Sequence, residues 1–159
     1  SLGAVKGKKV LIVGDIRHSR VALSNILCLK ALGAEVMLCG PATLIPKPAA
    51  EMGVQVEWDL DKALAWCDVA NMLRVQHERM DMKYFPSARE YSRQFGLTRE
   101  RLERRGRPLT IMHPGPINRG VEITSAVADH EQSIILEQVE NGVAVRMAVL
   151  YLLAANRKN

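Results

Sequence analysis

The sequence predicts an α/β domain in which a parallel sheet of about five strands lies between helices on both faces, a three-layer α/β/α arrangement. Short apolar runs of strand length alternate along the chain with longer segments of helical periodicity. The apolar runs are nearly continuous, as expected for strands that are buried on both faces of a parallel sheet. The length of 159 residues fits one domain, so we expect residues 1–159 to form a single unit.

The expected elements alternate in order along the chain. Strands are expected at residues 8–15, 35–41, 54–58, 68–76 and 108–114. Helices are expected at residues 19–33, 47–53, 59–67, 87–95, 98–105, 131–140 and 143–156. Ser19 and Asp59 precede their helices as amino-terminal caps, and Gly33 lies just past the end of the first helix. Asn141-Gly142 is expected to separate the last two helices.

The positive charge of the chain, +5 at pH 7, is concentrated in one segment. Five arginines lie close together: Arg99, Arg101, Arg104, Arg105 and Arg107. Such a cluster is compatible with a nucleic-acid partner. Glutamates interrupt it, however, and few aromatic side chains lie nearby for base stacking. We therefore favour a solvated helix face and expect no nucleic-acid partner.

Cys28, Cys39 and Cys67 each lie in an apolar run, and no two of them have the CxxC spacing of a metal site. We interpret them as buried thiols in a reducing cytoplasm, and we expect neither a disulfide nor a bound metal. The sequence has no signal-peptide pattern, and its longest apolar run, residues 147–155, is too short to span a membrane. A cytoplasmic protein without a membrane partner is expected.

Three of the expected strands end in polar segments, and in parallel sheets ligands bind beyond the carboxyl ends of the strands. The first strand is followed by Asp15, which we expect to bond to nearby backbone N–H groups, and by Arg20. Arg20 lies in the first turn of the next helix, where a cation is unfavourable unless an anion binds beside it. An arginine that points into water is an equally good interpretation.

The fourth strand is followed by Arg74, Gln76 and Glu78, which share one face if the chain stays extended. Arg74 and Gln76 can hold one carboxylate between them, and Glu78 can hold the guanidinium of Arg74 from behind. The alternative is an edge strand with a polar face.

The fifth strand runs into "HPGPINRGVE", residues 113–122. Proline lacks an N–H group, so the carbonyls of Pro114 and Gly115 are acceptors with few competing donors nearby. The alternative is a simple turn that ends the strand. We expect His113 to be buried and hydrogen-bonded rather than a catalytic base, and Arg119 to pair with Glu122. Together, the three strand ends suit the binding of a small dicarboxylate that carries an amine.

Taken together, "VGDIRHSRVALSN", "MLRVQHERM" and "MHPGPINRGVE" resemble the second half of aspartate carbamoyltransferase. The resemblance covers essentially the whole chain and includes the final "NGVAVRMAVLYLLAANR". Ornithine carbamoyltransferase is the near relative, but it typically has Cys-Leu-Pro where this chain has Pro-Gly-Pro. The resemblance implies transfer of a carbamoyl group from carbamoyl phosphate to L-aspartate, a step of pyrimidine synthesis, with no metal or organic cofactor.

The resemblance also implies roles for individual residues. Arg20 would bind the α-carboxylate of aspartate, and Arg74 with Gln76 would bind the β-carboxylate. The carbonyls of Pro114 and Gly115 would orient the attacking amine and the carbamoyl group, and the Gly115–Pro116 peptide bond would be cis. Supporting roles fall to the following residues: Asp15, Glu78, Arg79, Pro116 and Arg146.

The carbamoyl-phosphate loop of the family, Ser-Thr-Arg-Thr-Ser, does not occur in this sequence. We therefore expect the aspartate-binding half of the enzyme, inactive alone and completed by a carbamoyl-phosphate domain in a homotrimer, with or without regulatory or dihydroorotase subunits. Residues 143–155 are apolar almost all round, so we expect a partner surface to cover them. The alternatives are a non-catalytic dicarboxylate-binding module and an ornithine-type domain.

Overall fold

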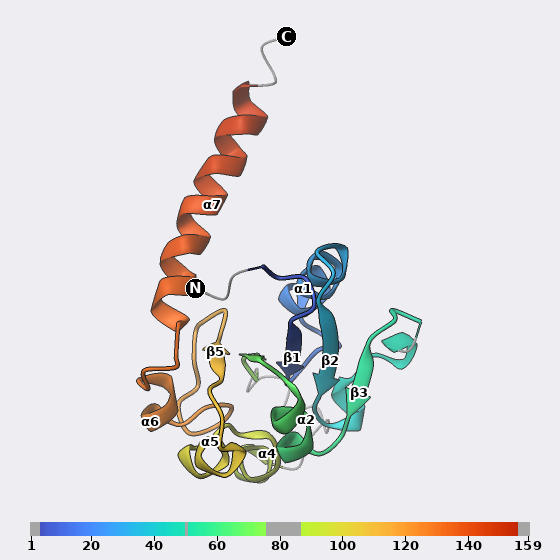
Figure 1. Cartoon of the computed structure of the whole chain (residues 1–159), viewed down its shortest axis with the longest axis vertical. Helices are drawn as coiled ribbons and strands as arrows, with labels where there is room; N and C mark the ends of the chain where they lie inside the picture. Colours follow the sequence, from blue (N-terminus) through green and yellow to red (C-terminus); the bar gives the residue numbers. More distant parts are fainter. Residues whose placement is uncertain (1–3, 50, 76–86, 156–159) are drawn as a thin grey trace.

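The computed structural model describes residues 4–49, 51–75 and 87–155. Its sheet has five strands in the order β3-β2-β1-β4-β5, and every neighbouring pair is parallel (Figure 1). The strands are β1 (Lys9–Val13), β2 (Glu35–Cys39), β3 (Gln55–Glu57), β4 (Val69–Met72) and β5 (Thr110–Met112). This order places the carboxyl ends of β1, β4 and β5 side by side.

Most of the described helices match expected ones, but the helix expected at residues 47–53 is seen only as a 3-10 turn at Lys47–Ala49, and the short helix at Ser125–Ala128 was not expected. The described helices are α1 (Arg20–Ala31), α2 (Leu60–Trp66), α4 (Ala88–Phe95), α5 (Arg99–Arg105), α6 (Ser125–Ala128) and α7 (Ile135–Ala155), with short 3-10 turns η1 (Ala42–Leu44) and η2 (Lys47–Ala49). The hydroxyl of Ser19 caps α1 by accepting a hydrogen bond from the N–H of Ala22. Asp59 caps α2 in the same way. Both capping predictions are confirmed.

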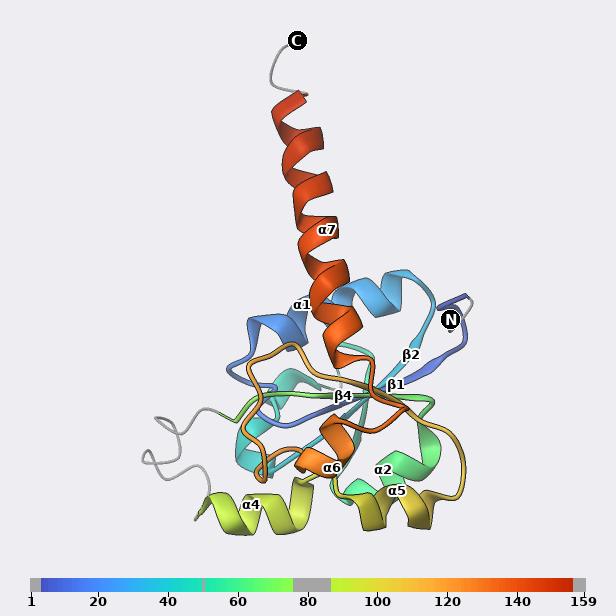
Figure 2. The ribbon, with the colours of Figure 1, turned by 90° about the vertical axis from the view of Figure 1, so that its left-hand side faces the viewer.

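Alternate residues of β1 pack against different helices, so helices cover both faces of the sheet. Leu11 and Val13 belong to a core cluster that includes residues of α2 and α4. Ile12 belongs to a second cluster, with Ala22 and Ile26 of α1. Figure 2 shows α1 on one side of the sheet and α2, α4 and α5 on the other. The predicted three-layer α/β/α arrangement is therefore confirmed.

The end of the chain differs from the expectation of two helices separated at Asn141-Gly142. Residues 135–155 form one continuous helix, α7, that projects away from the sheet (Figure 1). A glycine inside a helix costs only about 1 kcal/mol, and the apolar residues around it favour the helix. Beyond Ile135, which is buried, the apolar side chains of α7 are exposed; Leu136 is 86% exposed and Tyr151 74% exposed.

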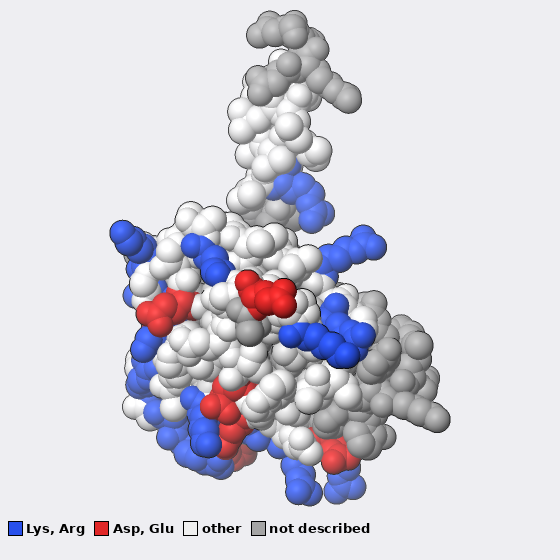
Figure 3. Space-filling model, turned by 90° about the vertical axis from the view of Figure 1, so that its right-hand side faces the viewer, with Lys and Arg blue, Asp and Glu red and all other residues white. Residues whose placement is uncertain are grey.

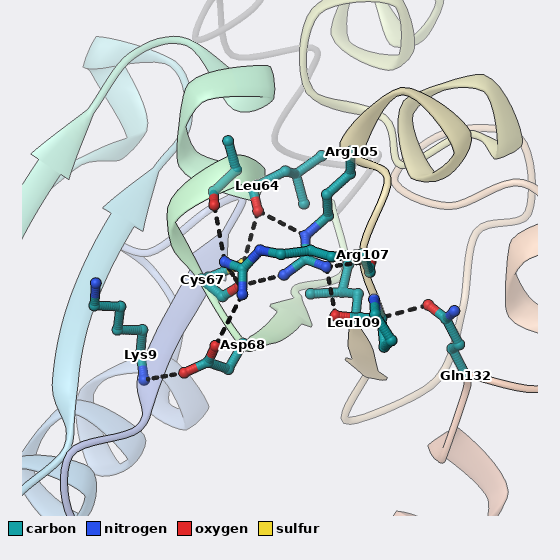
Figure 4. Close-up of polar contacts among 10 residues, drawn as sticks. Lys9, Leu64, Cys67, Asp68, Arg105, Arg107, Leu109 and Gln132 are labelled. Carbon is teal, nitrogen blue, oxygen red and sulfur yellow. Dashed lines mark hydrogen bonds and ion pairs between the residues drawn. The ribbon is translucent and has the colours of Figure 1, made fainter.

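Two arginines of the basic segment are not on a solvated helix face, contrary to our prediction. Arg105 donates from its Nε atom to the carbonyl of Leu64 at 2.8 Å, and also bonds to the carbonyl of Cys67 (Figure 4). Arg107 donates to the carbonyls of Ala65 and Cys67, both at 2.8 Å. These carbonyls lie at the carboxyl end of α2, where the last carbonyls of a helix lack partners within the helix. The two guanidiniums therefore cap α2.

The three thiols have two different environments. Cys39 and Cys67 are buried, and burial raises the pKa of Cys39 to about 12 and that of Cys67 to about 11. Cys28 is exposed, so the prediction that it is buried is wrong. It lies on α1 and lines an apolar pocket together with Val69 and Met112. None of the described helices is long and apolar enough to cross a membrane.

We predict that Arg105→Ala lowers the free energy of unfolding by about 2 kcal/mol, because partly buried carbonyls at the end of α2 lose a charged donor. Urea unfolding followed by circular dichroism measures the change. Arg99→Ala is the matched control, since Arg99 only pairs with Glu103 on the exposed side of α5 and should matter much less. Equal losses in the two variants would contradict the capping role.

Candidate functional site

The loop after β1 is shaped by two glycines and one buried carboxylate. Gly14 has a φ of +126°, and a Cβ atom on Gly40 would lie 2.7 Å from the carbonyl oxygen of Gly14, so the two backbones approach closely there. Asp15 is buried and accepts hydrogen bonds from the backbone N–H of His18 at 3.2 Å and from its Nδ1 at 2.8 Å. The predicted structural role of Asp15 is confirmed, and the turn delivers Arg20 to the first position of α1.

The chain leaves β4 directly beside this loop. The N–H of Leu73 donates to the carbonyl of Val13 at 2.8 Å, which continues the pairing of β4 with β1 by one residue. Arg74 follows and is half-buried. Its Nε atom is buried and has no hydrogen-bond partner among the described residues. A buried guanidinium N–H group without a partner is unfavourable, so this atom is well placed to bind an anionic oxygen.

The chain leaves β5 through a loop that a buried histidine holds in place. His113 is fully buried; its Nδ1 atom accepts a hydrogen bond from the N–H of Gly115 at 2.9 Å. Its Nε2 atom therefore carries the proton and donates to Oε1 of Glu122 at 3.2 Å. The Gly115–Pro116 peptide bond is cis, as predicted. The expectation of a buried, hydrogen-bonded His113 is also confirmed.

Glu122 and Asn118 connect this loop to the end of β4. Oε1 of Glu122 also accepts from the backbone N–H of Asn118 at 2.6 Å, and the side chain of Asn118 donates to the carbonyl of Val75 at 2.7 Å. The predicted pairing of Arg119 with Glu122 is wrong. Glu122 is fully buried, whereas Arg119 points outward and forms a two-bond ion pair with Asp129, both bonds at 2.8 Å.

The three strand ends enclose one pocket of about 420 Å³. Its lining residues are Asp15, His18, Ser19, Arg20, Val21, Leu73, Arg74, Pro114, Gly115 and Pro116. Two arginines thus face a rim of proline and glycine residues, as the sequence predicts. Arg146 is elsewhere, on the projecting α7. Gln76, Glu78 and Arg79 lie outside the described residues.

Three residues at or near the pocket were given no role, or the wrong partner, from the sequence. His18 lines it and pairs with Asp15, although it was assigned no role. Glu122 was identified, but with the wrong partner. Tyr91 of α4 is buried beneath the loop after β1, and a Cβ atom on Gly14 would lie 3.2 Å from the Tyr91 hydroxyl. Burial raises the pKa of Tyr91. The signal for Tyr91 is its position in α4, four residues before Phe95, on one apolar face of that helix.

A parallel α/β sheet with two arginines and a proline-rich loop around a pocket at its carboxyl edge is the arrangement typical of domains that bind small anions. Residues 6–153 match the sequence model of the family "Aspartate/ornithine carbamoyltransferase, Asp/Orn binding domain". The chain belongs to this family.

The catalytic subunits of aspartate carbamoyltransferase from Christiangramia forsetii and Cytophaga hutchinsonii are 68% and 65% identical to this chain. The matches cover 99% and 98% of the chain but 51% of each relative, so the chain spans about half the length of these proteins. The ornithine carbamoyltransferase of Pyrococcus furiosus has a TM-score of 0.77 at 28% identity, over 93% of this chain and 50% of its own. An aspartate transcarbamoylase from Trypanosoma cruzi in complex with aspartate and phosphate has a TM-score of 0.71 at 25% identity. This match covers 94% of the present chain and 48% of the Trypanosoma cruzi chain.

We predict that Glu122→Ala lowers the free energy of unfolding by at least about 2 kcal/mol, because His113 Nε2 and the N–H of Asn118 both lose their buried acceptor. Thermal or urea unfolding provides the measurement. Asp129→Ala removes a carboxylate from the exposed pair with Arg119 and should cause a far smaller loss. Similar stability of the two variants would show that Glu122 does not hold the loop.

Proposed function

We propose that this chain is the aspartate-binding half of an aspartate carbamoyltransferase, a cytoplasmic enzyme that transfers a carbamoyl group from carbamoyl phosphate to L-aspartate. One observation carries the proposal: Arg20, Arg74 and the Pro114–Pro116 loop, from three separate strand ends, line the same pocket. The high identity to aspartate carbamoyltransferase catalytic subunits supports aspartate as the acceptor. No metal or organic cofactor is proposed, because the ligand requires only charge and orientation.

In the proposed binding mode, the two arginines hold the two carboxylates of aspartate. Arg20 binds the α-carboxylate, helped by the positive amino end of α1. Arg74 binds the β-carboxylate, and its Nε–H group gains the acceptor that it lacks among the described residues. We extend the same role to Gln76. The carbonyl of Pro114 then accepts a hydrogen bond from the amine and directs its lone pair outward, toward the carbamoyl donor.

The proposed reaction needs no covalent intermediate on the protein. The amine nitrogen attacks the carbonyl carbon of carbamoyl phosphate, a carbon–nitrogen bond forms, and the bond from that carbon to the phosphate oxygen breaks. The amine gives up one proton to the departing phosphate. The contribution of this chain is to fix the position of the nucleophile, which can supply several kcal/mol of rate acceleration.

The donor in this proposal is bound by the other half of the enzyme, the part of the relatives that this chain does not match. α7 supports a partner of that kind, because its apolar side chains are exposed over most of its length. A homotrimer, and regulatory or dihydroorotase subunits, belong to the same proposal. A non-catalytic dicarboxylate-binding module and an ornithine-type domain are the rivals. The second arginine, Arg74, argues against ornithine, whose side chain ends in a cation.

We predict that Arg74→Ala, tested in the complete enzyme, lowers kcat/KM for aspartate. The loss should correspond to at least about 3 kcal/mol of transition-state stabilisation, because a desolvated carboxylate of the substrate loses its partner. Steady-state kinetics with each substrate varied in turn separate the effects, and the KM of carbamoyl phosphate should change much less. Arg119→Ala, outside the pocket, is the control. An equal loss for both substrates would refute the assignment of Arg74 to aspartate.

We also predict that the 159-residue chain alone does not carbamoylate aspartate, whereas it does when mixed with the separately produced carbamoyl-phosphate half. The physical reason is that the described lining of the pocket contains two arginines, Arg20 and Arg74. In our proposal both bind aspartate, so no lining arginine remains to bind the phosphate group of carbamoyl phosphate. Product formation from labelled carbamoyl phosphate is the readout. Full turnover by the chain alone would overturn the division of labour between the two halves.

A further inference from the structure

A second recess lies between α4, α5 and the turn at Gly120, away from the pocket described above. It has a volume of about 580 Å³ and shares no lining residue with the first pocket. Its lining residues are Ala88, Arg89, Ser92, Arg93, Thr98, Arg101, Arg104, Gly120 and Val121. In Figure 3, Lys and Arg side chains gather along the end of the molecule that lies opposite α7, where Figure 1 places α4 and α5.

The positive charge of this recess is only partly neutralised. Arg104 pairs with Asp61 at 2.8 Å, and Arg101 lies 3.5 Å from the same carboxylate. Arg101 is further held by a hydrogen bond from its Nη2 atom to the carbonyl of Arg93 at 3.0 Å, and its side chain is only 15% exposed. Arg89 and Arg93 have no acidic partner among the described residues. Asp61 therefore pairs with two of the four guanidiniums that line the recess.

The neighbouring glutamates do not line the recess. Glu103 pairs with Arg99 on the far side of α5, and Glu90 accepts a hydrogen bond from Gln94 along α4. The lining of the recess thus contains four arginines and no acidic residue, and one of these arginines, Arg101, is partly buried. Arginines that converge without compensating acids repel one another, unless an anion binds between them.

We propose that this recess binds a small anion with at least two phosphoryl groups. Guanidinium groups match phosphate oxygens with paired hydrogen bonds, and Ser92 adds a hydroxyl to the same wall. The volume is that of a small-molecule site. The two arginines without acidic partners match a ligand of two or more negative charges. The site is independent of aspartate binding, since it shares no residue with the first pocket.

Titration of inorganic pyrophosphate into the 159-residue chain, followed by calorimetry at constant ionic strength, tests this proposal. The Arg20→Ala substitution weakens anion binding to the first pocket, and pyrophosphate should still bind to the second recess in this background. In that background Arg93→Gln should weaken binding about tenfold, the loss expected for one charged hydrogen bond. Arg93→Lys, which keeps the charge, should recover part of it. The carbonyl of Arg93 that holds Arg101 is retained in both variants.

Arg99→Gln is the matched control, because it removes the same charge from α5 but does not line the recess. It should change the affinity less than twofold. Equal losses in Arg93→Gln and Arg99→Gln would overturn the proposal in favour of general electrostatic attraction. Loss of all binding in Arg20→Ala would assign the anion to the first pocket. Sulfate binding as tightly as pyrophosphate would refute the requirement for two phosphoryl groups.

Discussion

The parallel order of β1, β4 and β5 is the constraint on which the pocket depends. Neighbouring parallel strands end at the same edge, so loops that are far apart in the sequence meet there without any long connection. The bond from the N–H of Leu73 to the carbonyl of Val13 extends this pairing up to the residue before Arg74. The glycines at positions 14 and 40 let the first loop approach its neighbour, because side chains there would collide with backbone.

The loop after β5 needs a second constraint, because its prolines cannot donate backbone hydrogen bonds. Side chains replace the absent backbone pairing. His113 accepts from Gly115, Glu122 accepts from Asn118, and Asn118 donates to Val75 at the end of β4. The buried pair of His113 with Glu122 thus fixes the loop to itself and to the neighbouring strand end. Held in this way, Pro114, Gly115 and Pro116 line the pocket.

Features that depend on local sequence could be predicted, whereas those that depend on distant partners could not. The caps at Ser19 and Asp59 are local, because each side chain bonds to N–H groups two or three residues away. The convergence of Arg20 and Arg74 followed from strand topology alone. By contrast, Arg105 caps α2 through a carbonyl 41 residues away, and no sequence pattern indicates that contact. Arg119 and Glu122 have suitable spacing, but burial of one and exposure of the other separates them.

The two ends of the molecule have opposite chemistry, and this separates the kinds of ligand that we propose for them. α7 presents exposed aliphatic side chains, each of which gains about 1.5–3 kcal/mol on full burial, so a protein surface is the favourable cover for it. The recess between α4 and α5 presents guanidiniums, which a protein core would bury only at a large desolvation cost. Because these surfaces lie at opposite ends (Figure 1), a partner packed on α7 leaves the arginines open to a small anion. The first pocket, which we propose to bind aspartate, lies on the sheet edge, so that the three surfaces can be occupied together.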